Sequence, residues 1–274
     1  MSRSYTEQIA PADFVEALTV PVRQAMAAVR WLEGRVPNRP KSEEARPEKA
    51  ALTDADCVSQ EILLVAVGDC FPGVQVSVEE DTPQVGRFSQ NRSSHTVVID
   101  PIDGTLRYLL GDGPYAVLVG LECEGRVDGA LVGLPQSDTL VRAVRGGGAQ
   151  ISVHGGPFRK AALTSGGSEL LVSYGLARDV RERLRREGLS LITASGGAIG
   201  IAPLLDGVCG ALRISAAPEG LSRRAWVSAL PTQEAGGRVE SLEGKFPESY
   251  QPDVSGVILG PDVAGVRRLR ASLG

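Results

Sequence analysis

The sequence predicts an α/β protein whose N-terminal part is of the α+β kind. Three apolar runs between residues 115 and 144 are separated by short turns, which is typical of an antiparallel sheet. Farther along, 170–174 and 190–194 are predicted as strands on either side of a helix over 178–186. A strand–helix–strand unit favours parallel pairing, so a parallel α/β arrangement is expected in this second part.

The composition is that of an ordinary globular protein and narrows the chemistry available. The chain has 274 residues, of which 42% are apolar and 23% charged, with a net charge of −4. A net negative charge gives no sign of the basic surface that binds a nucleic-acid polymer. No apolar run approaches the length of a membrane span, and no secretory signal is visible, so a cytoplasmic location without membrane contact is expected. The four cysteines are dispersed and only two histidines are present, so carboxylates are the main groups available for catalysis or metal binding.

The first elements are predicted from hydrophobic spacing and from proline. A helix is expected between residues 8 and 34, where apolar residues recur every three or four positions. Pro21 is expected to break or kink it. The polar stretches 35–50 and 82–95 are expected to be mobile surface segments.

Two carboxylates lie on a turn at the end of a buried strand, within Val97–Thr105. Three β-branched residues lead into Asp100, and Pro101 interrupts the ladder because it has no N–H to donate. Asp103 follows, and Gly104 lets the backbone come close to a ligand. Mg²⁺ favours carboxylate oxygens, often together with substrate phosphates. The turn is therefore a candidate metal site, with a surface turn carrying two capping aspartates as the alternative.

The string Asp100-Pro101-Ile102-Asp103-Gly104-Thr105 resembles the signature of the inositol monophosphatase family, which are Mg²⁺-dependent phosphomonoesterases. The resemblance covers roughly residues 50–240. It implies a layered αβαβα sandwich, with an α+β half over 1–158 and an α/β half over 159–274. It also implies Mg²⁺ as cofactor, a homodimer, and a small phosphorylated metabolite (a sugar, polyol or nucleotide phosphate) hydrolysed by metal-activated water.

The same resemblance implies roles for individual residues. The implied Mg²⁺ ligands are Glu79, Asp100, the Ile102 carbonyl and Asp103. The implied substrate-binding residues are Gly104, Thr105, Gly196 and Gly197. Glu80 is the one-residue alternative to Glu79, since both follow a predicted strand over 74–78. Thr53 and Asp56 match a family element, so Asp56 and Thr105 are expected to activate the attacking water together.

Each assignment has a purely structural alternative. Asp54 and Asp56 can be a cap and a first-turn charge of the helix that follows Thr53. The acidic run 79–81 can be a solvated turn, and Gly196-Gly197 can be a tight turn at a helix start. The glycines 146–148 are predicted to be a plain hairpin turn, because no Lys-Ser or Lys-Thr follows them.

The C-terminal part departs from the family pattern at the second metal-binding segment. Relatives carry a Trp-Asp pair before a Glu-Ala-Gly-Gly turn. That turn is present at Glu234–Gly237, but Val227 follows Trp226, and counting back from the turn places Arg224 at the aspartate's position. Arg224 can supply positive charge to a substrate or repel a second Mg²⁺. Glu219 is the nearest acid that can compensate.

Two functions remain open on these grounds. The first is an active phosphatase with a weakened second metal site. The second is a catalytically degenerate family member that binds ligands or acts as a scaffold. The arginines 213, 223 and 224 would suit a second phosphate or a carboxylate on the ligand. A two-metal nuclease is disfavoured by the net negative charge.

Overall fold

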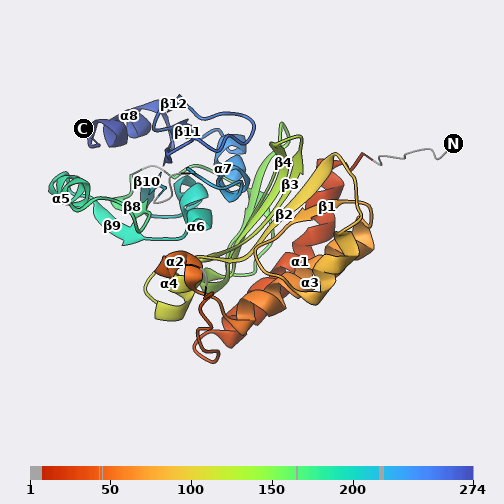
Figure 1. Cartoon of the computed structure of the whole chain (residues 1–274). Helices are drawn as coiled ribbons and strands as arrows, with labels where there is room; N and C mark the ends of the chain where they lie inside the picture. The colour runs from red at the N-terminus through yellow and green to blue at the C-terminus, as the bar shows by residue number, and fades with distance from the viewer. Residues whose placement is uncertain (1–7, 43, 45, 165, 216–218, 274) are drawn as a thin grey trace.

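Helices and sheets alternate in layers through the molecule (Figure 1). The computed structural model describes residues 8–42, 44, 46–164, 166–215 and 219–273. Helices cover the outer face of each of two sheets, and further helices fill the space between the sheets. The predicted αβαβα sandwich is therefore confirmed.

The first sheet has seven strands in the order in which they occur along the chain. They are β1 (Gln75–Ser77), β2 (His95–Asp103), β3 (Ala116–Cys123), β4 (Arg126–Leu134), β5 (Thr139–Val144), β6 (Gly148–Ser152) and β7 (Arg159–Lys160). Only β1 and β2 pair in parallel. The antiparallel run expected between residues 115 and 144 is confirmed, and the predicted hairpin turn joins β5 to β6 through Gly146 and Gly147, with Gly148 as the first residue of β6.

Two long helices, α1 (Pro11–Leu32) and α3 (Asp54–Cys70), cover the outer face of this sheet. The predicted break at Pro21 is wrong, because α1 runs through this residue, and a kink there stays a prediction. Leu18, Val22 and Ala25 are fully buried on both sides of Pro21, as part of the core between α1 and the sheet. This packing outweighs the one helical hydrogen bond that a proline cannot donate.

The two segments expected to be mobile loops carry local structure. The stretch 35–50 contains the short helix α2 (Pro47–Ala50), and its backbone bonds to itself, as from the Lys41 N–H to the Ala50 carbonyl at 2.8 Å. The stretch 82–95 contains the 3₁₀ helix η1 (Pro83–Phe88). Turn composition alone did not reveal these short helices.

The second sheet has six strands in the order β12-β11-β13-β10-β8-β9. Their bounds are β8 (Glu169–Val172), β9 (Ser190–Thr193), β10 (Val208–Ile214), β11 (Arg238–Ser241), β12 (Gly244–Lys245) and β13 (Gly256–Gly260). Helix α5 (Arg178–Arg186) joins β8 to β9, which pair in parallel as predicted. The proposed division of the chain at residue 158 stays a prediction.

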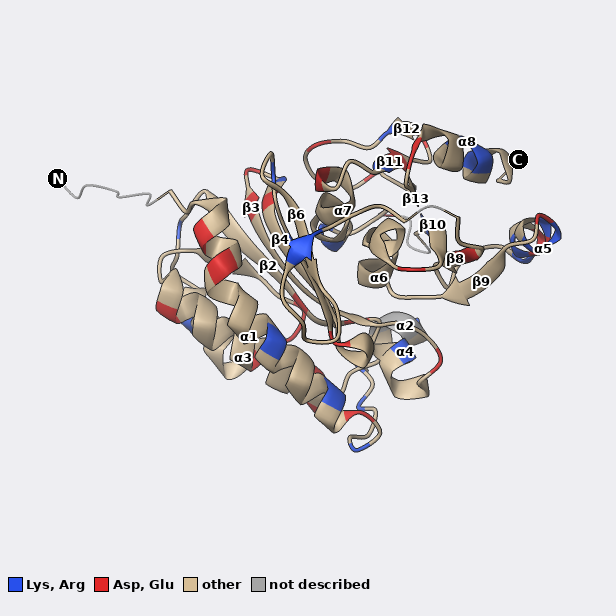
Figure 2. Cartoon of the chain, turned by 180° about the vertical axis from the view of Figure 1, so that it is seen from behind, with Lys and Arg blue, Asp and Glu red and all other residues tan. Residues whose placement is uncertain are grey.

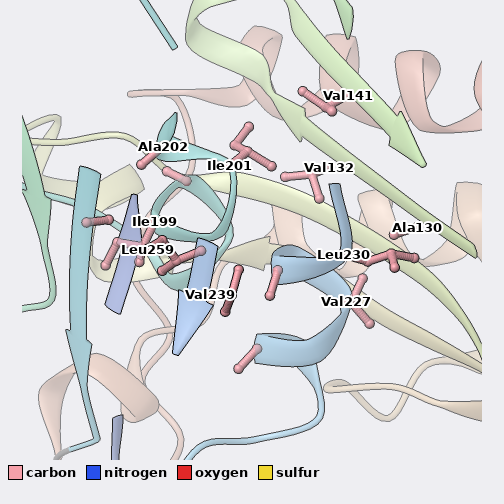
Figure 3. Packing of buried hydrophobic residues seen from close by; sticks show 14 of the residues in the cluster. Ala130, Val132, Val141, Ile199, Ile201, Ala202, Val227, Leu230, Val239 and Leu259 are labelled. Atoms are coloured by element: carbon pink, nitrogen blue, oxygen red, sulfur yellow. The ribbon is translucent and has the colours of Figure 1, made fainter. Parts of the chain in front are cut away.

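Helices α6 (Gly196–Gly200) and α7 (Arg224–Glu234) lie between the two sheets. Figure 3 shows Val227 and Leu230 of α7 facing Ala130 and Val132 of β4, within one apolar cluster. Gly120 of β3 makes this close approach possible, because a Cβ there would overlap the Val227 side chain. The short helix α4 (Thr105–Leu110) follows β2 directly.

Helix α8 (Val263–Ala271) lies with α5 on the outer face of the second sheet. Figure 2 shows basic residues on α5 and α8, and α5, like α1, also carries acidic residues. No helix among the described residues is long and apolar enough to span a membrane.

The contact between Gly120 and Val227 yields a stability prediction. Gly120→Ala should lower the free energy of unfolding by about 1–3 kcal/mol, since the added methyl group overpacks the layer between the sheets. Urea denaturation followed by circular dichroism measures this. The control is Gly73→Ala, where an added Cβ meets no atom within 4 Å. An equal effect of the two changes would contradict the packing argument.

Candidate active site

The two aspartates of the signature lie at the end of β2. The strand extends to Asp103, but its register with β3 shifts between Asp100 and Asp103, on either side of Pro101. Asp100 is fully buried. In the part of the chain that the structure describes, neither of its carboxylate oxygens accepts a hydrogen bond. Burial raises the pKa of Asp100, and the guanidinium of Arg224 counteracts this.

Asp56 and Thr105 are brought together as expected. Thr53 caps α3, and its backbone N–H and Oγ1 donate to Asp56 Oδ2 over 2.8 and 2.7 Å, which closes a capping box. The other oxygen, Oδ1, lies 3.0 Å from Thr105 Oγ1. Asp56 thus caps its helix with one oxygen and reaches Thr105 with the other. Burial raises the pKa of Asp56 to about 6, although hydrogen bonds from Thr53 and Thr105 oppose the shift.

Glu79, the predicted metal ligand after β1, is engaged by two cationic side chains. Its Oε1 accepts from Lys41 Nζ over 3.1 Å, and its Oε2 lies 3.0 Å from Arg224 Nη1. Burial opposes charge on this carboxyl group, but Arg224 and Lys41 outweigh it and lower its pKa. Glu80 points to the same lysine at 2.6 Å, and its carbonyl accepts from the Gln60 amide. Lys41 therefore contacts both Glu79 and Glu80, the two alternative candidates for the metal ligand.

Arg224 lies at the centre of the acidic group. It is the first residue of α7, and its Nη1 lies 3.0 Å from Glu79 Oε2 and 3.0 Å from Asp100 Oδ2. A cation at a helix N-terminus is opposed by the helix dipole, so these carboxylates must hold it there. Burial lowers the pKa of Arg224, but Asp100 and Glu79 raise it further. The guanidinium therefore stays charged between the two acids.

The predicted glycines allow segments from the two halves to meet. Gly104 has φ of 94° and faces the Ser195 side chain, which a Cβ at Gly104 would overlap. A Cβ at Gly196 would overlap the guanidinium of Arg213, and one at Gly197 would overlap Ala116. The Gly197 N–H donates to Asp103 Oδ2. Helix α6 is therefore seated directly against the aspartate turn.

Most of these residues line one cavity of about 680 Å³, but Asp56, Glu80 and Gly197 are not among its lining residues. Its acidic wall includes Glu79, Asp100 and Asp103. The facing side chains include Lys41 and Arg224. A cavity of this size, lined by convergent charged groups, fits a small polar ligand.

The donor set fits one divalent cation but not two. Mg²⁺ is held by one or two carboxylates together with substrate phosphates. Both buried oxygens of Asp100 lack a hydrogen-bond partner among the described residues, and Asp103 and Ile102 line the same cavity. Among the described residues, no three His, Cys, Asp or Glu side chains are arranged to hold a metal. Arg224 occupies the position at which the family resemblance implies an aspartate ligand for a second ion.

The sequence of most of the chain matches a known family. The family model that matches is that of the inositol monophosphatase family, over residues 14–194. The chain belongs to this family. The matched region ends before Arg213 and Arg224, so the segment that departs from the family's metal-binding pattern lies outside it. Members of the family are generally metal-dependent phosphatases, which supports a phosphatase-type function here.

Similar proteins cover the chain to different extents. A glucose-1-phosphate thymidylyltransferase of Streptomyces griseus is 29% identical over 73% of this chain and 76% of its own length. An inositol-1-monophosphatase of Mesorhizobium japonicum is 32% identical over 48% of each chain, so this chain matches about half of that relative. The extragenic suppressor protein suhB of Bartonella henselae has a TM-score of 0.74, with 18% identity, over 95% of this chain and 98% of that one. That likeness shows the fold.

Lys41 is a charged residue of the site that the sequence did not predict. Lys41 lies in the segment expected to be a mobile loop, and its contacts with Glu79 and Glu80 are set by tertiary folding. No spacing or motif in the sequence marks it. Asp54, the other acidic residue in the first turn of α3, pairs with Arg39 at 2.9 Å on the surface. Glu219 lies 3.8 Å from Arg46 and is not among the residues lining the cavity around Asp100.

The position of Arg224 predicts how the site responds to a change of its charge. Arg224→Asp should bind one more Mg²⁺ ion than the unaltered chain, because it replaces a cation by a carboxylate next to Asp100. Isothermal titration calorimetry with MgCl₂ gives the stoichiometry. Arg178→Asp, on the far helix α5, is the control and should leave the stoichiometry as it is. Equal stoichiometry in Arg224→Asp and the unaltered chain would refute this role.

Proposed function

We propose that this chain is a phosphatase for a small phosphomonoester, with Mg²⁺ held by Asp100, Asp103 and the Ile102 carbonyl. The observation that carries the proposal is the position of Thr105 Oγ1. It lies 3.0 Å from Asp56 Oδ1 and 3.0 Å from the Ile102 carbonyl oxygen, in the same cavity as the two aspartates. A divalent cation at this place supplies Lewis acidity toward a phosphoryl oxygen and toward water.

The Thr105–Asp56 pair supplies a route for a proton. The Thr105 hydroxyl has one proton, and donating it to Asp56 Oδ1 leaves its lone pairs free to accept a hydrogen bond from an attacking water. Asp56 then takes up a proton through Thr105 Oγ1. A pKa of about 6 suits a carboxylate that acts as a base near neutral pH.

Arg224 and Lys41 supply the remaining positive charge. Both are already positioned beside Glu79, and Arg224 also contacts Asp100. A guanidinium stays protonated under all relevant conditions and presents several N–H donors. We assign Arg224 the task of stabilising charge on phosphoryl oxygens as a fixed cation, in place of a second metal ion.

The relatives indicate which phosphomonoesters to test first. One is named for glucose 1-phosphate and another for inositol phosphate. The cavity volume of about 680 Å³ suits ligands of this size. We therefore propose a sugar or polyol phosphate as the first class of substrate, with nucleotides next. Assembly into a homodimer stays a prediction.

A second function is favoured by one specific observation. Lys41 and Arg224 contact Glu79 and Asp100, so cations that an anionic ligand can use are in place without any metal. A chain that binds a phosphorylated metabolite without turning it over would have this arrangement. Phosphate release separates the two functions.

The proposed activity predicts phosphate release that depends on Mg²⁺. A panel of glucose 1-phosphate, inositol 1-phosphate, and nucleoside 3′- and 5′-phosphates should contain at least one compound that is hydrolysed with Mg²⁺ and not with EDTA. Asp103→Asn should reduce this rate about 100-fold or more, since it alters a carboxylate that holds the ion. Release of phosphate is measured colorimetrically.

Two results would contradict the phosphatase. Turnover that is the same in EDTA, or in Asp103→Asn, would exclude Mg²⁺ chemistry at this turn. Absence of release from every compound, combined with binding of a phosphomonoester in calorimetry, would favour the binding function instead.

The pKa of Asp56 predicts the pH dependence of the reaction. The base must be deprotonated, so kcat/KM should fall tenfold per unit as the pH drops below about 6. Asp56→Asn should lose most of the rate. Asp54→Asn, two residues away and paired with Arg39 on the surface, is the matched control and should keep both rate and profile. A flat profile between pH 4.5 and 7 would rule out Asp56 as the base.

A further inference from the structure

Arg213 is a cation in this site without a described partner. It lies near the end of β10, and the side chain extends over Gly196 at the start of α6. Within the described residues, its Nη1 is buried and has no hydrogen bond. A buried polar group without a partner costs free energy, and a charged one costs more. The position therefore points to a group that is supplied from outside the chain.

The other cations that line the same cavity are each paired with a carboxylate. Lys41 contacts Glu79 and Glu80, and Arg224 contacts Glu79 and Asp100. Arg107 pairs with Asp112 at 2.7 Å, and Arg223 pairs with Glu122 while stacking on Tyr250. Arg213 has no such ion pair among the described residues: Asp103 and Asp100 attract its charge, but its buried Nη1 donates no hydrogen bond and is left for a ligand.

Arg213 also lies where two cavities meet. The larger one, of about 680 Å³, contains the aspartate turn and Thr105. The second, of about 400 Å³, extends along Ser173 and Gly220. Arg213 and Gly196 line both. A ligand whose phosphoryl group lies beside Thr105 can therefore reach the guanidinium with a second group.

We propose that Arg213 binds a second anionic group, a phosphate or a carboxylate, on the same small phosphomonoester that the aspartate turn receives. A guanidinium matches both groups, because its parallel N–H donors bind two oxygens at once. The absence of a side chain at Gly196 leaves room for the guanidinium at this place. The inference rests on the proposed function for the placement of the first phosphoryl group, and it adds the charge of the ligand class.

Binding without metal tests this independently of turnover. The probes are glucose 1-phosphate, glucose 1,6-bisphosphate and glucuronic acid 1-phosphate, titrated in EDTA by calorimetry. The bisphosphate or the glucuronic acid derivative should bind about tenfold more tightly than glucose 1-phosphate, as expected for one added charge-assisted contact. Tighter binding of glucose 1,6-bisphosphate alone would show that Arg213 binds a second phosphate. Tighter binding of glucuronic acid 1-phosphate alone would show that it binds a carboxylate.

Variants locate the preference at Arg213. Arg213→Gln should reduce the preference for the ligand with the second anionic group to less than about threefold. It should change the affinity for glucose 1-phosphate by less than about twofold. Gly196→Ala should have the same effect while keeping the charge, because its Cβ displaces the guanidinium. Arg107→Gln removes a cation from the same cavity and should keep the preference.

The outcomes distinguish this inference from the proposed activity. Equal affinity for all three probes, or no binding of any, would overturn it, and so would an unchanged preference in both Arg213→Gln and Gly196→Ala. A preference that depends on Arg213, in a protein that releases no phosphate with Mg²⁺, would support the inference and reject the phosphatase.

Discussion

The contact of Arg224 with Glu79 and Asp100 organises the site. Glu79 follows β1, Asp100 belongs to β2, and Arg224 begins α7, so one guanidinium connects the first sheet to the layer between the sheets. Asp100 is completely buried, and a buried carboxylate without a counter-charge would be strongly unfavourable. Replacing Arg224 by a neutral residue would leave that charge uncompensated. The start of α7 and the end of β2 are therefore stabilised by the same ion pairs.

Close approach between layers is the second constraint. Gly120 admits Val227, Gly104 faces Ser195, and Gly196 leaves room for the Arg213 guanidinium. Gly120 and Gly104 each allow a segment of the first 160 residues to approach one from the remainder of the chain. Gly196 allows two segments of that remainder to approach each other. The cavity is consequently defined by backbone positions, and small changes in side-chain volume at these glycines would move the charged groups that line it.

The sequence predicts those parts of the structure that depend on local spacing. The Thr53–Asp56 spacing is that of a capping box, and the signature at the end of β2 contains its own turn, so both could be found from neighbouring residues. Lys41 could not, because its contact with Glu79 joins positions 38 residues apart. At Pro21 a local signal was present but misleading. The rule against proline in helices is overridden there by burial of α1 on the sheet.

Substitution of a carboxylate by Arg224 changes what the site can do chemically. A guanidinium neutralises the acids as a metal ion would, but it has no open coordination position and cannot make a water more acidic. In the proposed reaction, deprotonation of the attacking water therefore depends more heavily on Thr105 and Asp56, whose side chains lie 3.0 Å apart. A fixed cation is also present before any ligand arrives, so affinity for an anion no longer requires metal binding first. Recognition of further negative charge by the proposed Arg213 contact adds to this affinity, whether or not turnover follows.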